Sequence, residues 1–364
     1  MSKVNLLRLS ITLLIVVGIG AATFYGPNFF IAKEQPAPRL RTGGTSVAAI
    51  LLENVWRPPY LINKGIRVDY ESTGSSAGVE RVIDGQYAVG FTHAALTEDQ
   101  KQAAKAKGGD VLHIPVIVCA VIPIYNLKEL KDKPPLKFTG EVLADIYRGK
   151  IERWNDPALK KLNEGVELPD SKIIVVHRED SSGTTFLFTD YLQDASEAWR
   201  KEVGPPNNKI KWPVGEGRER NQGVANYVAR TEGTIGYVDR VFAGEGGDEV
   251  LQFGAVQNKD KTAFIHAETA NMTAALAGHL AEVSDDLTVR LINLSGPDAY
   301  PICGCIWAVC YQAQPASNLK MLVDFLQWVT HDGQKIATNR TFAPLPEEIV
   351  RRVDEKLKLF RLAP

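Results

Sequence analysis

Helix-like and strand-like segments alternate along most of this chain, and this alternation constrains its fold more than any other feature. Apolar residues recur at helical spacing over 47–55, alternate as in a strand over 66–70, and return to helical spacing over 79–83. Near the end, amphipathic helices are expected over 319–329 and after Pro346. Repeated β–α alternation is typical of proteins in which helices cover mainly parallel sheets. We therefore predict an α/β fold.

Three local signals add detail to this prediction. The segments 114–126 and 172–176 are rich in apolar and β-branched residues, and they are expected to be strands. The first is either a strand pair or one run interrupted by prolines. Thr97 followed three residues later by Gln100 is a capping box, which predicts the start of a helix.

Composition narrows the functional classes. The 364 residues are 45% apolar, so the chain can bury a large core, and at about 150 residues per domain they suggest two domains. The 42 basic and 43 acidic residues give a formal charge of −1, which argues against a nucleic-acid-binding protein. Cys303, Cys305 and Cys310 lie far from Cys119, and C-x-C-x4-C is not a zinc spacing. Free buried thiols or one disulfide are expected.

The first 32 residues are expected to be a targeting segment. Lys3 and Arg8 precede a long uncharged, apolar run, which is typical of a signal peptide or of an uncleaved membrane anchor. Residues 33–42 are polar and contain prolines, so they are expected to form a linker. Both alternatives place the bulk of the protein outside the cytoplasm.

Three strand-to-helix junctions share one composition. They are TGGTS (42–46), STGSSAG (72–78) and HREDSSGTT (177–185). Glycine permits close approach of the backbone, Ser and Thr cap helices, and N–H groups at a helix N-terminus attract anions. Arg178 adds a fork of donors, and Asp180 is placed to hold that fork. Ordinary capping explains any one junction, but three of them together predict an oxyanion site.

A serine hydrolase is the alternative that uses the same residues. Gly74-Ser75-Ser76-Ala77-Gly78 fits G-x-S-x-G between a strand and a helix, with Ser76 as the nucleophile. No HGGG-like segment precedes it, and the short pattern is common by chance. The sequence has no G-x4-G-K-[ST], no H-E-x-x-H and no G-x-G-x-x-G after a strand, so nucleotide and zinc enzymes have no support from motifs.

Ordered blocks of sequence resemble one known family, the periplasmic phosphate-binding proteins of phosphate-specific ABC importers. The blocks are GGTSVAAILLENVW, VDYESTGSSAGVERVI, LKFTGEVLADIYRGKIERWNDPAL, VVHREDSSGTTFLFTDYL, NQGVANYV with GTIGYVDRVFA, and FAPLPEEIVRRV, from about residue 42 to about 355. The resemblance implies two α/β lobes joined by two crossover strands, with the ligand in the cleft between them. It places lobe 1 at 43–116 plus 304–364 and lobe 2 at 117–303.

The resemblance also implies a function and a set of ligand-binding residues. The protein would bind inorganic phosphate or a related oxyanion as a monomer and deliver it to an ABC permease, with no enzymatic activity, no cofactor, no metal and no nucleic acid. A membrane-tethered sensor or scaffold that has lost transport remains an alternative. The residues carried over by position, with Asp180 in support, are Thr45, Ser46, Ser75, Arg178, Ser182, Gly183 and Thr184.

This sequence departs from the family at two ligand-binding positions, His93 and Ser46. His93 stands where the family has an aspartate that accepts a proton from phosphate, and Ser46 replaces a phenylalanine. Histidine can accept when neutral and only donate when charged, so we expect weaker discrimination against sulfate. Cys119 falls on one implied crossover strand and Cys303 and Cys305 on the other. We therefore expect a disulfide from Cys119 to Cys303 or Cys305.

Overall fold

The computed structural model describes residues 38–244, 251–338 and 341–364, and residues 39–364 form one compact unit. The targeting segment expected at 1–32 lies outside the described residues. Among the helices that the structure describes, none is long and apolar enough to cross a membrane. The linker expected over 33–42 ends earlier than predicted, because Arg39–Gly44 form the first strand.

The chain begins with a group of three parallel strands. β1 (Arg39–Gly44) lies between β2 (Arg67–Ser72) and β3 (Val89–Thr92), and both pairings are parallel. Helices connect the strands, as the alternation of patterns predicts. These are α2 (Ser46–Ile50), the π-helical turn η1 (Leu51–Trp56), α3 (Arg57–Lys64), α4 (Ser75–Ile83) and α5 (Glu98–Lys107). The capping box of Thr97 and Gln100 is confirmed at the start of α5.

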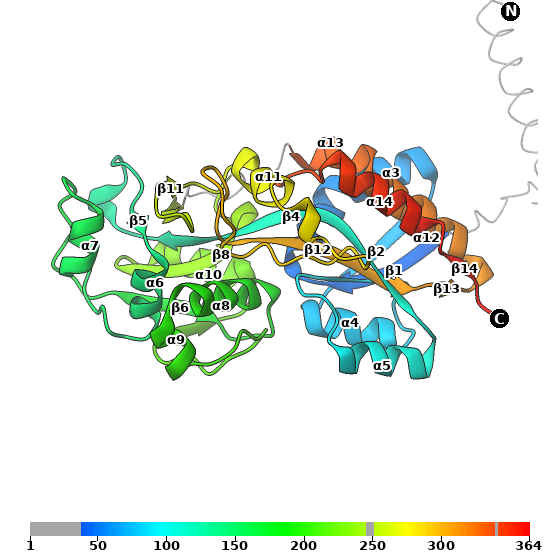
Figure 1. Ribbon diagram of the computed structural model, residues 1–364, viewed down its shortest axis with the longest axis horizontal. Coiled ribbons are helices and arrows are strands. Elements are labelled where there is room, and N and C mark those ends of the chain that lie inside the picture. Colours follow the sequence, from blue (N-terminus) through cyan, green and yellow to red (C-terminus); the bar gives the residue numbers. More distant parts are fainter. Residues whose placement is uncertain (1–37, 245–250, 339–340) are drawn as a thin grey trace, which may run out of the picture. The chain divides into compact units, whose positions relative to one another are not determined.

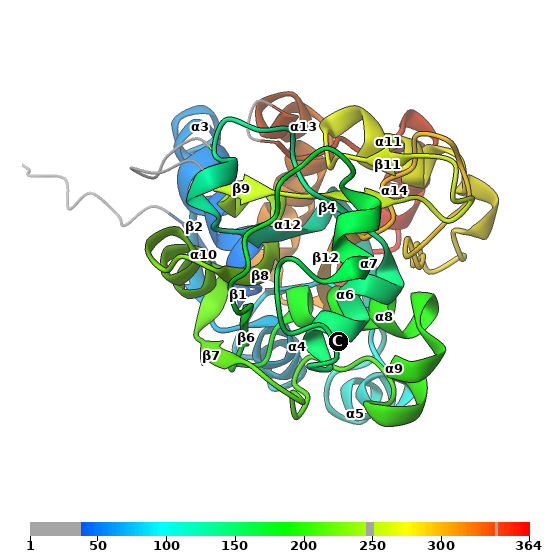
Figure 2. The same ribbon diagram turned by 90° about the vertical axis from the view of Figure 1, so that its left-hand side faces the viewer.

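A second group of parallel strands follows later in the sequence. β6 (Ile174–Arg178) lies between β7 (Glu216–Arg218) and β8 (Thr234–Asp239). Its helices are α6 (Gly140–Tyr147), α7 (Pro157–Leu162), α8 (Gly183–Ala195), α9 (Glu197–Glu202) and α10 (Arg220–Arg230). Figure 2 looks onto this group, with α6, α7 and α9 toward the viewer.

Two antiparallel strands connect the groups. β4 (Val111–Tyr125) pairs through its first part with β12 (Cys303–Tyr311) and through its last five residues with β8. β12 also pairs with β3, which gives the continuous order β2-β1-β3-β12-β4-β8-β6-β7. Figure 1 shows β4 and β12 running between the two sets of strands and helices. The α/β prediction is confirmed, although the sheet is mixed because the two connecting strands are antiparallel to their neighbours.

The remaining elements are short or lie near the C-terminus. They are η2 (Lys128–Leu130), β5 (Lys137–Phe138), η3 (Arg240–Phe242), β9 (Gln252–Phe253), β10 (Ala255–Gln257), β11 (Phe264–Ile265), α11 (Thr269–Ala277), η4 (Leu280–Glu282), β13 (Ala313–Gln314), α12 (Ala316–Thr330), α13 (Asp332–Ala337), α14 (Glu347–Leu357) and β14 (Arg361–Leu362). The last two helices expected from the sequence correspond to α12 and α14.

The disulfide expected at the connecting strands is wrong, since all four cysteines are free and buried. The register explains this result. Cys119 lies opposite Gly304, whereas Cys303 and Cys305 are opposite Ala120 and Val118. Successive side chains of a strand point to opposite faces of the sheet, so Cys119 projects from the other face than Cys303 and Cys305. A disulfide would require one strand to shift its register by one residue, so that both sulfur atoms lie on the same face of the sheet.

Candidate functional site

The junction between β1 and α2 places Thr45 at the start of a helix. Its side chain accepts a hydrogen bond from the Val47 amide at 3.4 Å, and its own amide donates to the Phe91 carbonyl of β3 at 3.0 Å. Gly44 has φ +135°, and a Cβ there would lie 2.1 Å from that same carbonyl. The glycine therefore lets β1 and β3 approach closely, which holds Thr45 at the carboxyl ends of both strands.

The second junction presents Ser75 at the first position of α4. The preceding Gly74 has φ +90°, and a Cβ there would lie 2.8 Å from the Ser181 carbonyl. Ser75 is 1% exposed, and its hydroxyl has no hydrogen-bond partner. A buried hydroxyl without a partner at a helix N-terminus is suited to donate to an anion.

The third junction leads from β6 into α8. Ser182 caps the helix by accepting from the Thr185 amide at 3.2 Å. The Tyr237 hydroxyl contacts the Thr185 hydroxyl at 2.6 Å and accepts from the Arg178 amide at 3.2 Å. The Tyr237 ring is held by stacking on Phe188 at 4.4 Å between centroids. Core packing thus fixes the end of β6 relative to the start of α8.

Arg178 is held as a fork at the end of β6. Its side chain is 3% exposed, and its Nε and Nη2 donate to the Asp180 carboxylate at 2.7 and 2.6 Å. Burial acts to raise the pKa of Asp180, but the hydrogen bonds and charge of Arg178 and the Arg220 amide outweigh it, so the pKa is lowered. The remaining nitrogen, Nη1, is buried without a partner. This arrangement confirms that Asp180 holds the guanidinium, as expected from the sequence.

His93 follows β3 and lies against the N-termini of α4 and α8. Its side chain is fully buried, and neither Nδ1 nor Nε2 has a hydrogen-bond partner. A Cβ built on Gly183 would lie 2.5 Å from His93 Nδ1 and 2.6 Å from the Ser75 hydroxyl. His93, Ser75 and the first turn of α8 therefore meet at one point, where only a residue without a side chain fits between them.

Asn221 joins the first and third junctions, and the sequence analysis did not select it. This fully buried residue of α10 donates through Nδ2 to the hydroxyls of Ser46 and Thr184, both at 3.2 Å. Its Oδ1 accepts from the Asp239 amide at 3.1 Å. No motif marks it, although it lies in the NQGVANYV block that carries the family resemblance.

Asp239 is a second residue that the sequence analysis did not select. It ends β8, is 1% exposed, and its Oδ2 lies 3.9 Å from His93 Nε2. It belongs to the GTIGYVDRVFA block. A lone aspartate at a strand end is usually a cap, and Asp239 Oδ1 does accept from the Val241 amide at 3.3 Å. Only the fold shows that its other oxygen faces His93.

The hydrolase interpretation of Ser76 is not supported. Its hydroxyl lies 3.0 Å from the Ser181 hydroxyl and accepts from Asn208 Nδ2 at 2.9 Å, so its contacts are with the α8 side of the site.

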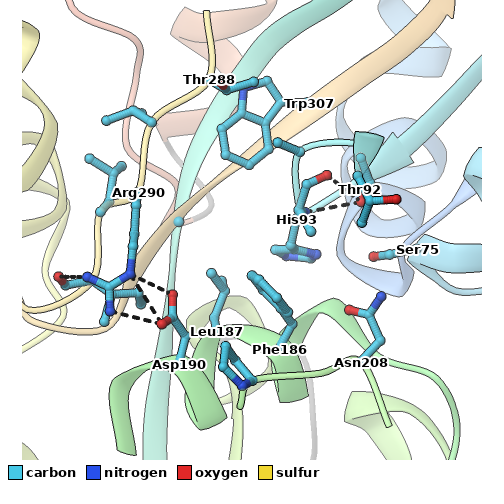
Figure 3. Close-up of a pocket in the computed structure, with 18 of the residues that line it drawn as sticks. Ser75, Thr92, His93, Phe186, Leu187, Asp190, Asn208, Thr288, Arg290 and Trp307 are labelled. Carbon is cyan, nitrogen blue, oxygen red and sulfur yellow. Dashed lines mark hydrogen bonds and ion pairs between the residues drawn. The ribbon is translucent and has the colours of Figure 1, made fainter. Parts of the chain in front are cut away.

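A cavity of about 550 Å³ lies next to these residues. Figure 3 shows His93, Ser75 and Asn208 on one side of this cavity, and the ion pair of Arg290 with Asp190 on another.

The site as a whole gathers unpartnered polar groups of the kind that suit an oxyanion. Four polar atoms of the predicted residues are buried without partners: the Ser75 hydroxyl, His93 Nδ1 and Nε2, and Arg178 Nη1. Around them lie the N-termini of α2, α4 and α8, whose first amides have no partner within the helix. Preorganised amides, hydroxyls and one guanidinium are the donors that hold phosphate or sulfate.

Comparison with known proteins places this chain in a family. A family model described as the PBP superfamily domain matches residues 32–332. The phosphate-binding protein PstS of Pasteurella multocida is 35% identical over 304 residues, which cover 83% of this chain and 85% of that protein. PstS of Methanocaldococcus jannaschii is 31% identical over 374 residues, which cover 96% of this chain and 94% of that protein.

Solved structures agree on the fold. The chain is similar to a high-affinity periplasmic phosphate-binding protein, PfluDING, solved with phosphate, with a TM-score of 0.70 and 18% identity over 87% of this chain and 93% of that one. A phosphate ABC transporter substrate-binding protein from Clostridium perfringens, with bound phosphate, has a TM-score of 0.58 and 19% identity over 85% of this chain and all of that one. From the matched family model and the curated relatives, this chain belongs to the PBP superfamily and, within it, to the PstS family of phosphate-binding proteins.

Proposed function

We propose that this protein binds inorganic phosphate between its two strand groups and delivers it to an ABC importer. Family membership supports the ligand class, and one observation carries the assignment of the site. The Ser75 hydroxyl, His93 Nδ1 and Arg178 Nη1 are buried donors or acceptors with no partner in the protein. Leaving such groups unsatisfied costs about 1–3 kcal/mol each, so a bound anion that satisfies all three is strongly favoured.

The proposed ligand shell is the set carried over from the family. Thr45, Ser46, Ser75, Ser182, Gly183 and Thr184 would donate from hydroxyls or backbone amides, and Arg178 would supply the charge. His93 would replace the family's carboxylate. Because an imidazole N–H can donate where a carboxylate can only accept, His93 would not reject a fully ionised anion as a carboxylate does. We propose that sulfate is excluded less strongly here than by an aspartate-containing relative.

Lobe movement is part of this proposal. Lobe 1 would comprise 43–116 and 304–364 and lobe 2 residues 117–303, with β4 and β12 as the connections. In the present arrangement Asn221 bonds Ser46 across this boundary, and Ser76 bonds Asn208 and Ser181. These polar side-chain contacts lie beside the site and suit a cleft that closes on its ligand and reopens. The targeting segment would place the closed form outside the cytoplasm, where a permease meets it.

Calorimetry on the exported protein tests the proposal directly. Phosphate, arsenate, phosphite and sulfate are titrated separately into protein freed of endogenous ligand by partial unfolding and dialysis. One phosphate per chain is expected, with arsenate close behind and sulfate measurable. Absence of heat with every anion, in protein whose circular dichroism and melting show an intact fold, would contradict the proposed function.

A further inference from the structure

Three chemically different metal-binding side chains meet beside the anion site. His93 follows β3, Cys119 lies on β4, and Asp239 ends β8. One ligand atom of each, a ring nitrogen, the Sγ and a carboxylate oxygen, lies within 4.8 Å of the other two. All three residues are at most 1% exposed. It is the one such group found among the residues that the structure describes.

The polar atoms of this group lack protein partners. His93 Nε2 and Asp239 Oδ2 face each other at 3.9 Å, too far for a hydrogen bond, and Nε2 has no other partner. Asp239 has only the weak thiol donor of Cys119 beside this oxygen. An unsatisfied buried polar group costs about 1–3 kcal/mol, because it has lost its water without gaining a full hydrogen bond. The proposed anion satisfies Nδ1 on the other side of the ring, but it leaves Nε2 and Oδ2 unexplained.

We propose that His93 Nε2, Cys119 Sγ and Asp239 Oδ2 bind a divalent transition-metal cation of the zinc type. Imidazole, thiolate and carboxylate are its usual ligands, and three protein ligands with an open fourth position form a known class of site. In a tetrahedral site such ligand atoms lie about 3.3–3.7 Å apart. His93 Nε2 and Asp239 Oδ2 lie 3.9 Å apart and the three ligand atoms lie within 4.8 Å of one another, so the side chains need to approach by at most about 1 Å. Water would take the fourth position.

The charges of the group suit a dication. Burial raises the pKa of the Cys119 thiol well above its usual value, with the nearby Asp239 charge adding to the effect. Without a cation the thiol therefore keeps its proton and donates weakly to the Gly304 carbonyl at 3.4 Å. A bound dication would displace that proton to solvent, and the thiolate and carboxylate would then neutralise its two charges. The site predicts release of one proton per metal.

A metal here would also define the role of His93 toward the anion. Coordination through Nε2 fixes the proton on Nδ1, which lies beside Ser75 and Gly183. Nδ1 would then donate to a bound oxyanion without the imidazole carrying a charge of its own. The three ligands lie at the end of β3 in the first strand group, on the connecting strand β4, and at the end of β8 in the second group. A bound cation would therefore hold the two groups together, as a bound phosphate would. Each ligand is expected to raise the affinity for the other, and by thermodynamic linkage the two factors are equal.

Metal titration of the whole exported protein, after treatment with a chelator and in phosphate-free buffer, tests this inference. One Zn²⁺ or Co²⁺ per chain is expected by elemental analysis after gel filtration. The Co²⁺ form should show the intense near-ultraviolet absorption of a thiolate ligand. Cys119→Ser should abolish that absorption and weaken binding at least about tenfold, since even the loss of an outer partner of a ligand costs that much. Asp239→Asn should weaken binding while the thiolate absorption persists at saturating Co²⁺.

Cys305→Ser is the matched control. Cys305 is also buried, lies opposite the neighbouring Val118, and contributes no ligand. This variant should bind one metal with the absorption unchanged, and melting curves show whether each variant is folded. Failure of the folded wild-type protein to retain metal, or Co²⁺ absorption unchanged in Cys119→Ser, would overturn the inference. The result is independent of the proposed function, because phosphate binding by metal-free protein is measured separately.

Discussion

Replacing Arg178 by alanine is expected to remove most of the affinity for phosphate while leaving the fold intact. The arginine supplies the one full positive charge among the ligand-binding residues carried over from the family. Its side chain is 3% exposed, two of its nitrogens are fixed on Asp180, and Nη1 is left unpartnered. The fork is therefore oriented before the anion arrives, and little entropy is lost when it binds.

The magnitude follows from this burial. Truncating one partner of a buried charged contact costs about 2–5 kcal/mol, which corresponds to about 30-fold to several-thousand-fold in affinity. The upper part of that range is expected, because the alanine variant also leaves the Asp180 carboxylate facing the anion. Arg178→Lys should recover only part of the loss, since an ammonium group cannot bind Asp180 with two nitrogens and still reach the ligand.

Calorimetric titration of phosphate into both variants measures the loss, and Arg148→Ala is the matched control. Arg148 is similarly buried, at 7% exposed, and it is paired with Asp145 at 2.6 Å and with Glu202 at the surface of α6 and α9. Its replacement should lower the melting temperature without changing phosphate affinity. Near-normal phosphate affinity in folded Arg178→Ala would refute the reasoning and the location of the site.

Three other perturbations test separate parts of the site. His93→Asp should restore an acceptor-only group and lower sulfate affinity relative to phosphate by about tenfold or more, measured by competition; an unchanged ratio would make His93 a bystander. Gly183→Ala should reduce phosphate affinity at least about tenfold, because its Cβ would overlap His93, whereas Gly223→Ala, whose Cβ meets nothing nearer than 3.6 Å, should not. The lowered pKa of Asp180 should stabilise the fold above its unfolded value near 3.8, and this contribution should disappear as pH falls through the lower folded value. Urea unfolding of wild type and Asp180→Asn should therefore differ at neutral pH and converge in acid; a difference that is constant with pH would contradict the assignment.

Local chemistry predicted well those features whose partners are close in the sequence. The capping box at Thr97, the caps at Thr45 and Ser182 and the hold of Asp180 on Arg178 all involve residues a few positions apart. Glycine-rich junctions could therefore be recognised as helix starts from composition alone. The family resemblance then supplied what composition lacks, namely that the three junctions face one another.

Features that depend on register or on distant elements were not predictable in this way. The segment 114–126 contains two prolines, so the sequence did not decide between a pair of strands and one continuous strand. The structure shows one strand. Pro115 lies opposite Trp307, where the register with β12 shifts. Cys119 appeared ready for a disulfide until the register placed it opposite Gly304. Asn221 and Asp239 resemble ordinary polar residues, because their importance depends on partners brought together only by the sheet order.

The position of β4 in the sheet has a consequence for how the chain acquires its structure. Its first part pairs with β12, which is synthesised near the end of the chain, and β3 also waits for β12. The edges of β3 and of the first part of β4 that pair with β12 therefore stay unpaired until almost the whole polypeptide exists. Since non-local pairings form slowly, a chain of this topology is expected to complete its sheet late in folding. Variants that weaken β12 pairing should lengthen this period and expose those edges to aggregation.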